Sequence, residues 1–306
     1  MPPESETDHP LVSVVIPTHD RLALLMEAID SVRAQSYAPI ELIVVDDGST
    51  DGTSDRLRAE PGLRLLRIDH NGRPGAVRNA GVAVATGDYV AFLDSDDLWM
   101  PDKLALQMEL LRASPGVPIV HSRELWLRDG RPVSQAGQRH RRSGWLFADA
   151  VRKCIVGPST VVLHRAVLRE VGGFREDLEI AEDYELWLRV TARFPVAYCD
   201  RPLVTKRAGH GDQLSERYGQ IERFRIDALA PLVAADHWAE PERSIARREL
   251  ARKCLIHAAG ARKRGRDGEA ARYEALAADV SRPAWKASTS AANSGSRAAY
   301  SRMDRR

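Results

Sequence analysis

Short apolar runs and helix-like segments alternate along the first third of the chain. The apolar runs are rich in Val, Ile and Leu and lie at residues 11–16, 40–45, 63–68 and 89–93. The segments between them favour helices, at residues 22–34, 53–59 and 76–85. Runs that are apolar on both faces indicate strands covered on both sides, and their alternation with helices is typical of parallel sheets. The pattern predicts an α/β fold with a doubly wound, mostly parallel sheet.

The remainder of the chain has fewer strand signals and more helical ones. It favours, in order, a helix at 102–112, a strand at 119–122, a β-like run at 156–163, a helix at 180–193, a strand at 196–199, and helices over 216–236 and 242–280. Residues 1–10 and 281–306 are poor in large apolar side chains, which predicts a disordered leader and tail. We expect one α/β domain over residues 11–210 and a helical extension over 211–280.

Charge is distributed unevenly along the chain, although the net charge is only +2. From Arg243 to the end there are 16 Lys and Arg against 6 Asp and Glu, whereas the preceding part has 29 against 37. Such a basic tail suggests contact with an anionic membrane or another acidic partner, although a solvated tail is the alternative. No feature of the sequence calls for a nucleic-acid partner.

The cysteines and the apolar stretches bear on the compartment. The 3 cysteines form no CxxC pair, which argues against a disulfide framework or a zinc site and fits a reducing cytosol. The first residues do not resemble a signal peptide, and no apolar stretch approaches the ~20 residues of a membrane helix. We expect a cytoplasmic protein. The basic tail also suggests peripheral contact with the inner face of the membrane.

An acidic cluster follows the apolar run at 89–93. It consists of Asp94, Asp96 and Asp97, with Ser95 between them. If the chain stays extended there, Asp94 and Asp96 point the same way. Three neighbouring carboxylates repel one another, and a divalent cation with a preference for oxygen ligands, Mg²⁺ or Mn²⁺, would relieve that repulsion. The carboxyl end of a strand is where open α/β sheets bind ligands, but a solvated acidic turn is the alternative.

A second acidic pair, Asp46 and Asp47, follows the run at 40–45 and places further acids at the same edge of the sheet. Several common sites are absent from the sequence. There is no GxGxxG after a strand, no GxxxxGK[ST] and no GxSxG. The dinucleotide fingerprint, the P-loop and the nucleophile elbow of α/β-hydrolases are therefore excluded.

Five stretches together resemble the inverting glycosyltransferases of family 2, which have the GT-A fold. They are VSVVIPTHDR at 12–21, ELIVVDDGSTDGT at 41–53, NGRPGAVRNAG at 71–81, DYVAFLDSDDLWMPDKL at 88–104 and GGFREDLEIAEDYELWLR at 172–189. They occur in the family's order and cover roughly residues 11–210. The family's opening is closer to PTYN, whereas this chain has Pro17, Thr18, His19 and Asp20. The resemblance implies the GT-A fold for residues 11–210.

The resemblance also implies roles for individual residues on the donor side. Thr18 and Asp47, with Asp46 beside it, would contact the nucleotide base, because a carboxylate can accept the imide N–H of uracil or thymine. Arg78 would contact the base or the diphosphate, whose geometry a guanidinium matches.

For the metal and the chemistry, the resemblance implies a second group. Asp94 and Asp96 form the DxD motif that contacts the ribose and a Mn²⁺ or Mg²⁺ ion, with Asp97 as the alternative metal ligand. His210 occupies a position where related sequences carry a histidine near the donor phosphates and the metal. Asp183, with Glu182 beside it, would be the general base.

The implied activity is transfer of a sugar from a nucleotide-diphosphate donor, with UDP- or dTDP-sugars favoured, to a hydroxyl acceptor with inversion. The acceptor would be a saccharide or a lipid-linked saccharide, in polysaccharide or glycolipid biosynthesis. One rival is a sugar-phosphate nucleotidyltransferase, which would need a basic, Gly-rich loop near the first strand that this chain lacks. The other is an inactive nucleotide-sugar binding module, whose expected mark is loss of an acid at Asp96, Asp97 or Asp183, and all three are present.

Overall fold

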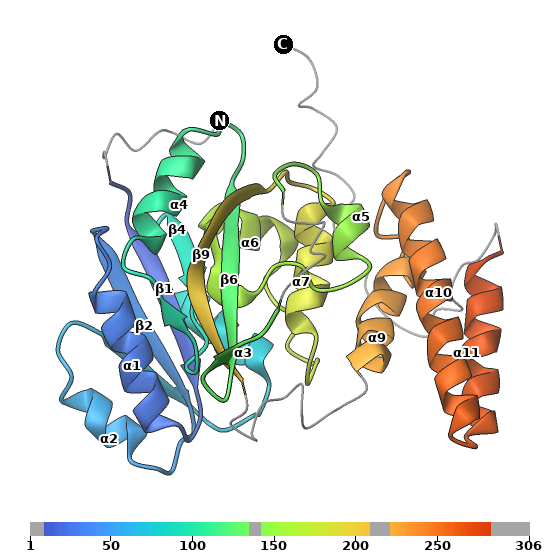
Figure 1. Ribbon diagram of the computed structural model, residues 1–306, viewed down its shortest axis with the longest axis horizontal. Coiled ribbons are helices and arrows are strands. Elements are labelled where there is room, and N and C mark those ends of the chain that lie inside the picture. The colour runs from blue at the N-terminus through green and yellow to red at the C-terminus, as the bar shows by residue number, and fades with distance from the viewer. Residues whose placement is uncertain (1–8, 135–141, 209–220, 283–306) are drawn as a thin grey trace.

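The computed structural model describes residues 9–134, 142–208 and 221–282 (Figure 1). Its centre is a nine-stranded sheet in the order β3-β2-β1-β4-β8-β6-β9-β5, with β7 paired to β6. The strands are β1 (Val12–Thr18), β2 (Ile40–Asp47), β3 (Arg64–Ile68), β4 (Tyr89–Phe92), β5 (Leu98–Trp99), β6 (Ile119–Arg128), β7 (Arg131–Pro132), β8 (Val161–His164) and β9 (Ala197–Ala208). The predicted α/β fold is confirmed, and a helical segment follows the sheet.

The first half of the sheet is parallel, with β3, β2, β1 and β4 side by side. Residues of β1 alternate between two cores. Val14 packs with Leu25 of α1 (Leu22–Arg33) on one face, and Val15 packs with Val77 of α3 (Pro74–Val84) on the other. Strand side chains alternate faces, so apolar residues on both faces let helices cover both sides of the sheet. The remaining helix of this half is α2 (Thr53–Arg58).

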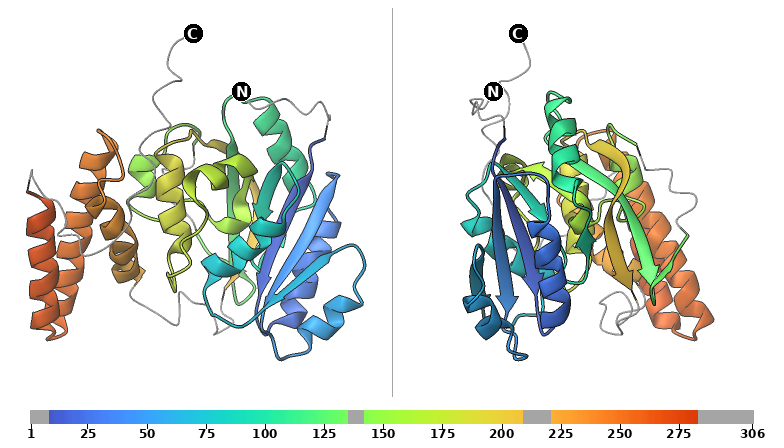
Figure 2. Two further views of the ribbon diagram at one scale, coloured as in Figure 1. Left: turned by 180° about the vertical axis from the view of Figure 1, so that it is seen from behind. Right: turned by 60° about the vertical axis from the view of Figure 1, so that its left-hand side comes forward.

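The second half of the sheet mixes strand directions. Strand β8 runs antiparallel to β4 and β6, whereas β9 runs parallel to β6 and antiparallel to β5. Its helical segments are α4 (Lys103–Arg112), α5 (Phe147–Ala150), η1 (Pro158–Thr160), α6 (Arg165–Val171) and α7 (Glu182–Thr191). Of these elements, α5 and α7 lie next to the last helices (Figures 1 and 2).

Several boundaries differ from the expectation. Strand β1 continues through Pro17, because β4 pairs only with residues up to Val15 and no longer flanks β1 there. The chain does not stay extended after β4: Asp97 N donates to Asp94 O at 2.9 Å, which closes a turn. The predicted strand at 196–199 is only the start of β9. Asp200, Arg201 and Pro202 interrupt the apolar run and hid its continuation. The β-like run at 156–163 contains η1 before β8 begins.

Helices α9 (Ile221–Ala234), α10 (Glu242–Lys263) and α11 (Asp267–Val280) form a layer beside the sheet domain (Figures 1 and 2). Contacts between α9 and α7 join this layer to the sheet half that follows β4. The predicted helical stretch 242–280 is divided at Gly265, which has a φ of +71° that favours glycine. None of the helices in the described residues has both the length and the apolar character to cross a membrane. The predicted leader and tail lie almost entirely outside the described residues.

Candidate active site

One cavity of about 1060 Å³ lies along the carboxyl ends of the parallel strands and extends to the start of α7. Its wall includes most of the residues that the sequence singled out. These are Thr18, Asp47, Arg78, Asp94, Asp96, Asp97, Glu182 and Asp183. The structure therefore brings together acids that lie almost ninety residues apart in the chain, from Asp94 to Asp183. His210 lies outside the described residues.

The base end of the cavity, which we define as His19, Asp47, His70, Asn71 and Gly72, is built from loops that follow β1, β2 and β3. The Asp47 carboxylate accepts hydrogen bonds from the backbone N–H groups of Asn71 and Gly72, at 2.9 and 3.0 Å. The rings of His19 and His70 stack with centroids 4.0 Å apart, and both Nδ1 atoms lie within hydrogen-bonding distance of the Asp47 carbonyl. Asp47 thus organises the loops around it.

Asp46 has a different environment from Asp47. Its side chain is fully buried, and its carboxylate accepts hydrogen bonds from the Ser49 N–H and from Arg67. Among the described side chains that line the cavity Asp46 does not occur. Its carboxylate stabilises the loop after β2. Direct contact of Asp46 with a nucleotide base stays a prediction, and the buried position of its side chain does not support it.

The acid turn, defined as Asp94, Ser95, Asp96 and Asp97, is held by polar partners on three sides. Ser159 donates to Asp97 Oδ2 at 2.5 Å and accepts from the Asp94 N–H at 3.1 Å. Arg21 Nη1 lies 3.2 Å from Asp96 Oδ2. Burial raises the pKa of the Asp97 carboxyl to about 7, and the positive charge of Lys206 opposes that rise. Asp96 therefore pairs with Arg21, whereas Ser159 bridges Asp94 and Asp97.

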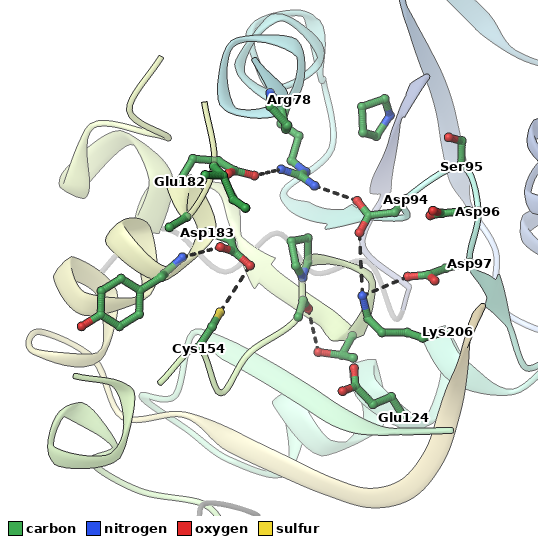
Figure 3. Close-up of a pocket in the computed structure, with 18 of the residues that line it drawn as sticks. Arg78, Asp94, Ser95, Asp96, Asp97, Glu124, Cys154, Glu182, Asp183 and Lys206 are labelled. Atoms are coloured by element: carbon green, nitrogen blue, oxygen red, sulfur yellow. Dashed lines mark hydrogen bonds and ion pairs between the residues drawn. The ribbon is translucent and has the colours of Figure 1, made fainter. Parts of the chain in front are cut away.

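Alternating charges link the acid turn to α7 (Figure 3). Arg78, which is 5% exposed, donates to Asp94 Oδ1 at 2.7 Å and to Glu182 Oε1 at 2.5 Å. Lys206 Nζ lies 3.2 Å from Asp97 and 3.8 Å from Asp94. Burial raises the pKa of the Glu182 carboxyl to about 7, against the opposing effect of the Arg78 guanidinium. Two cations and three acids thus form a continuous row across the cavity floor.

Asp183 projects into the same cavity from the first turn of α7. The helix begins after Ala181, whose φ of +68° turns the chain sharply. Asp183 Oδ1 accepts the Tyr184 N–H at 2.6 Å, and Oδ2 accepts the Cys154 thiol at 3.3 Å. Burial raises the pKa of the Cys154 thiol well above its usual value, and the Asp183 carboxylate adds to the effect. The thiol therefore stays protonated, and its single S–H has two acceptors at 3.3 Å, Asp183 Oδ2 and the Val156 carbonyl.

Oxygen ligands of the acid turn fit a hard divalent cation such as Mg²⁺ or Mn²⁺ in their chemistry. In the described structure, however, Asp94 and Asp97 share the Lys206 ammonium, and Asp96 faces Arg21. The group of described side chains whose ligand atoms have metal-like spacing is instead His19, Asp47 and His70, at the base end. Metal binding by Asp96 or Asp97 therefore stays a prediction.

The structure adds four functional candidates that the sequence did not reveal: Arg21, Cys154, Ser159 and Lys206. Arg21 ends the first of the five family stretches, where no role was assigned to it, and the other three lie outside those stretches. Each contacts an acid that a motif does contain. The one signal in the sequence is weak. Lys206 and Arg207 form a basic pair within an otherwise β-like stretch, and the structure places that pair on β9 beside the acid turn.

Comparison with known proteins settles the family. The sequence profile of glycosyl transferase family 2 matches residues 13–170, which is more than half of the chain. The chain belongs to glycosyl transferase family 2. TuaG of Bacillus subtilis, described as a putative teichuronic acid biosynthesis glycosyltransferase, is 31% identical over 193 residues, 62% of this chain and 75% of TuaG.

Other relatives are longer than this chain. The uncharacterized protein y4gI of Sinorhizobium fredii is 37% identical over 194 residues, which cover 60% of this chain and 20% of y4gI. An uncharacterized glycosyltransferase of Rickettsia felis is 30% identical over 202 residues, 65% of this chain and 33% of the relative. The chain therefore matches a fifth to a third of the length of these relatives.

Solved structures share the GT-A fold of this family 2 member. Residues 1–349 of S. aureus TarS in complex with UDP-GlcNAc superpose with a TM-score of 0.68 at 22% identity, covering 88% of this chain and 79% of TarS. The mannosyltransferase PcManGT of Pyrobaculum calidifontis, in complex with GDP-Man and Mn²⁺, gives 0.61 at 24% identity, over 89% and 76%. At these identities the likeness concerns the fold.

Proposed function

We propose that the protein transfers a sugar from a nucleotide-diphosphate donor to a hydroxyl acceptor with inversion at the anomeric carbon, with UDP- and dTDP-sugars as the favoured donors. The observation that carries the proposal is the shared cavity, in which Asp183 lies opposite the acid turn and Arg78 spans the space between them. Family membership supports it, as do neighbours of the same fold whose complexes contain UDP-GlcNAc or GDP-Man.

The base end supports the nucleotide half of the proposal. The stacked rings of His19 and His70 offer flat apolar faces beside an Asp47 carboxylate. A carboxylate has about four lone-pair sites, so Asp47 can accept an imide N–H in addition to its two backbone donors. Within the described residues the buried Thr18 hydroxyl has no hydrogen-bond partner, which fits a group that waits for a ligand.

The reaction is a single displacement. Asp183 takes the proton of the acceptor hydroxyl while that oxygen bonds to the anomeric carbon, and the bond from this carbon to the phosphate oxygen breaks with its electron pair on the nucleoside diphosphate. Arg78 and Lys206 provide positive charge where the leaving diphosphate gains negative charge. A Mn²⁺ or Mg²⁺ ion, held by Asp96 or Asp97, would neutralise part of the same charge. Cys154 orients the general base, Asp183, through a hydrogen bond from its thiol.

The acceptor is a saccharide or lipid-linked saccharide in this proposal, because TuaG is described as a teichuronic acid biosynthesis enzyme. A peripheral contact of the basic tail with an anionic membrane belongs to the same proposal, and the charge of residues 243–306 supports it. The enzyme would then work on the cytoplasmic side of that membrane.

A donor screen tests the proposal. Thermal unfolding is measured with Mn²⁺ and each of a set of UDP-, dTDP- and GDP-sugars, because a ligand that binds only the folded state stabilises it by ~2.7 kcal/mol at a hundredfold excess over Kd. The donor that stabilises the protein is then incubated with it, and the products are separated. Release of nucleoside diphosphate supports the proposal. Release of pyrophosphate from a nucleoside triphosphate and a sugar phosphate, or no donor binding at all, contradicts it.

A further inference from the structure

Lys206 occupies a fixed position between two acids of the acid turn. Its Nζ lies 3.2 Å from Asp97 Oδ2 and 3.8 Å from Asp94 Oδ2, and 15% of its side chain is exposed (Figure 3). Both acids also have further partners, Ser159 for Asp97 and Arg78 for Asp94. A buried carboxylate needs a compensating charge, and here one ammonium serves two of them.

The surroundings of Lys206 are shaped to hold its long side chain. The Nζ lies 5.6 Å from the centroid of the Trp126 ring, within the range of a cation–π contact. Gly157 lies against the aliphatic stem, and a Cβ added at Gly157 would come within 3.3 Å of Lys206 Cε. The Lys206 side chain is therefore held beside the acids by packing against Trp126 and Gly157, unlike a solvent-exposed surface lysine.

The position conflicts with simultaneous binding of a divalent ion. An ion held by Asp97 or Asp96 would lie beside the Lys206 ammonium. The two positive charges would repel each other, and strongly so where little solvent screens them. The repulsion falls if the ammonium acquires another anionic partner. A nucleoside diphosphate supplies one, because its phosphate oxygens would enter the cavity that Lys206 lines.

We propose that Lys206 couples the binding of the divalent ion to the binding of the nucleotide. Before donor binding its ammonium is the counter-cation of Asp94 and Asp97 and weakens metal binding there. When the nucleoside diphosphate arrives, the ammonium transfers to the phosphate oxygens, and the carboxylates become free for the ion. This inference rests on the proposed function. It predicts that metal and nucleotide each strengthen the binding of the other, since such coupling is reciprocal.

The test compares Mn²⁺ binding to the full chain with and without UDP. Binding is measured from the electron paramagnetic resonance signal of free Mn²⁺. For the wild-type protein we expect weak binding alone and binding about tenfold tighter or more with saturating UDP. Lys206→Met should bind Mn²⁺ about tenfold tighter than wild type without UDP, and UDP should tighten that binding less than it does in wild type. Lys206→Arg keeps the charge and should retain the coupling.

Arg73→Met is the matched control. It removes one positive charge from the wall of the same cavity, where the Arg73 side chain bonds to the Glu176 carbonyl and not to the acid turn. Equal tightening in Arg73→Met and Lys206→Met would show a general charge effect and overturn the inference. Thermal unfolding provides the second measurement. Lys206→Met should be stabilised by Mn²⁺ alone, and wild type should be stabilised far less.

Two other outcomes separate this inference from the proposed function. If the wild-type protein transfers sugar but binds Mn²⁺ as tightly as Lys206→Met without UDP, the inference is wrong and the proposed function stands. If the wild-type protein binds neither UDP, dTDP nor GDP, with or without Mn²⁺, both are wrong. A stronger dependence of UDP affinity on Mn²⁺ in wild type than in Lys206→Met would support both.

Discussion

The two ends of the cavity are built in different ways. At the base end, Asp47 is held by backbone N–H groups of a loop that starts soon after β3, and every partner comes from the parallel half of the sheet. At the other end, side chains from the acid turn, α3, α7 and β9 meet through ion pairs between residues far apart in the chain. We call this other end, with Asp94, Asp97, Arg78, Glu182 and Lys206, the transfer end. The base end is thus held by contacts within one half of the sheet, whereas the transfer end depends on ion pairs between distant parts of the chain.

Because the two ends are built differently, we expect mutations at each end to have different effects. Variants at the base end should alter affinity for the nucleotide and leave the chemical step nearly intact. Variants at the transfer end should alter the chemical step or the stability of the fold, because buried charges lose their partners there. The following variants test that division, from the largest expected effect to the smallest.

Asp183→Asn should have the largest effect on transfer. Loss of a general base typically lowers the rate ~10²–10⁴-fold, and the amide is close in size to the carboxylate. Nucleotide affinity, measured by calorimetry, should stay near wild type. Asp177→Asn, in the loop before α7, is the control and should keep full activity. Transfer by Asp183→Asn at a wild-type rate would exclude Asp183 as the base.

Arg78→Met should destabilise the fold as well as the donor complex. It leaves the buried Glu182 carboxylate and the partly exposed Asp94 carboxylate without their shared cation, and the loss of one partner of a buried ion pair such as Arg78–Glu182 typically costs about 3–5 kcal/mol. Urea unfolding should show this as a lower midpoint with an unchanged slope. Arg73→Met, at the exposed start of the same helix, should unfold as wild type does. Equal midpoints for Arg78→Met and wild type would refute the bridging role.

Asp47→Asn tests the base end alone. The amide can accept only through its oxygen, so one of the two backbone donors or the incoming imide loses its partner, at about 1–3 kcal/mol. Kd for the nucleotide should rise roughly tenfold, whereas kcat at saturating donor should change little. A drop in kcat with unchanged Kd would break the proposed division between the two ends.

Cys154→Ala should have the smallest effect. It removes a weak S–H donor from Asp183, so kcat should fall a few-fold, by about 1 kcal/mol at most, with an unchanged KM for the donor. Cys154→Ser restores a hydroxyl donor and should recover most of the rate. Cys199→Ala, which changes a cysteine in β9, serves as the control. Identical rates for the alanine and serine variants would mean that the thiol does not orient the base.

The sequence predicted the parallel half of the sheet closely, because short apolar runs that end in Asp pairs are local signals. It also brought Asp183 into the candidate site through its motif. It did not predict the closed turn at 94–97, which depends on a hydrogen bond from Asp97 N to Asp94 O, nor the length of β9, in which charged and apolar residues are mixed. Lys206 was missed for the same reason. Its significance arises from the packing of β9 beside the acid turn, and no local pattern records such a contact.

The most direct test of the shared cavity is a crystal structure of the full chain with the nucleoside diphosphate that the donor screen selects, together with Mn²⁺. We expect the nucleotide base beside Asp47 and the stacked His19 and His70 rings, the diphosphate at the acid turn within reach of Lys206, and Asp183 facing the vacant sugar position. A nucleotide bound elsewhere on the protein, or one whose diphosphate points away from the acid turn, would contradict it.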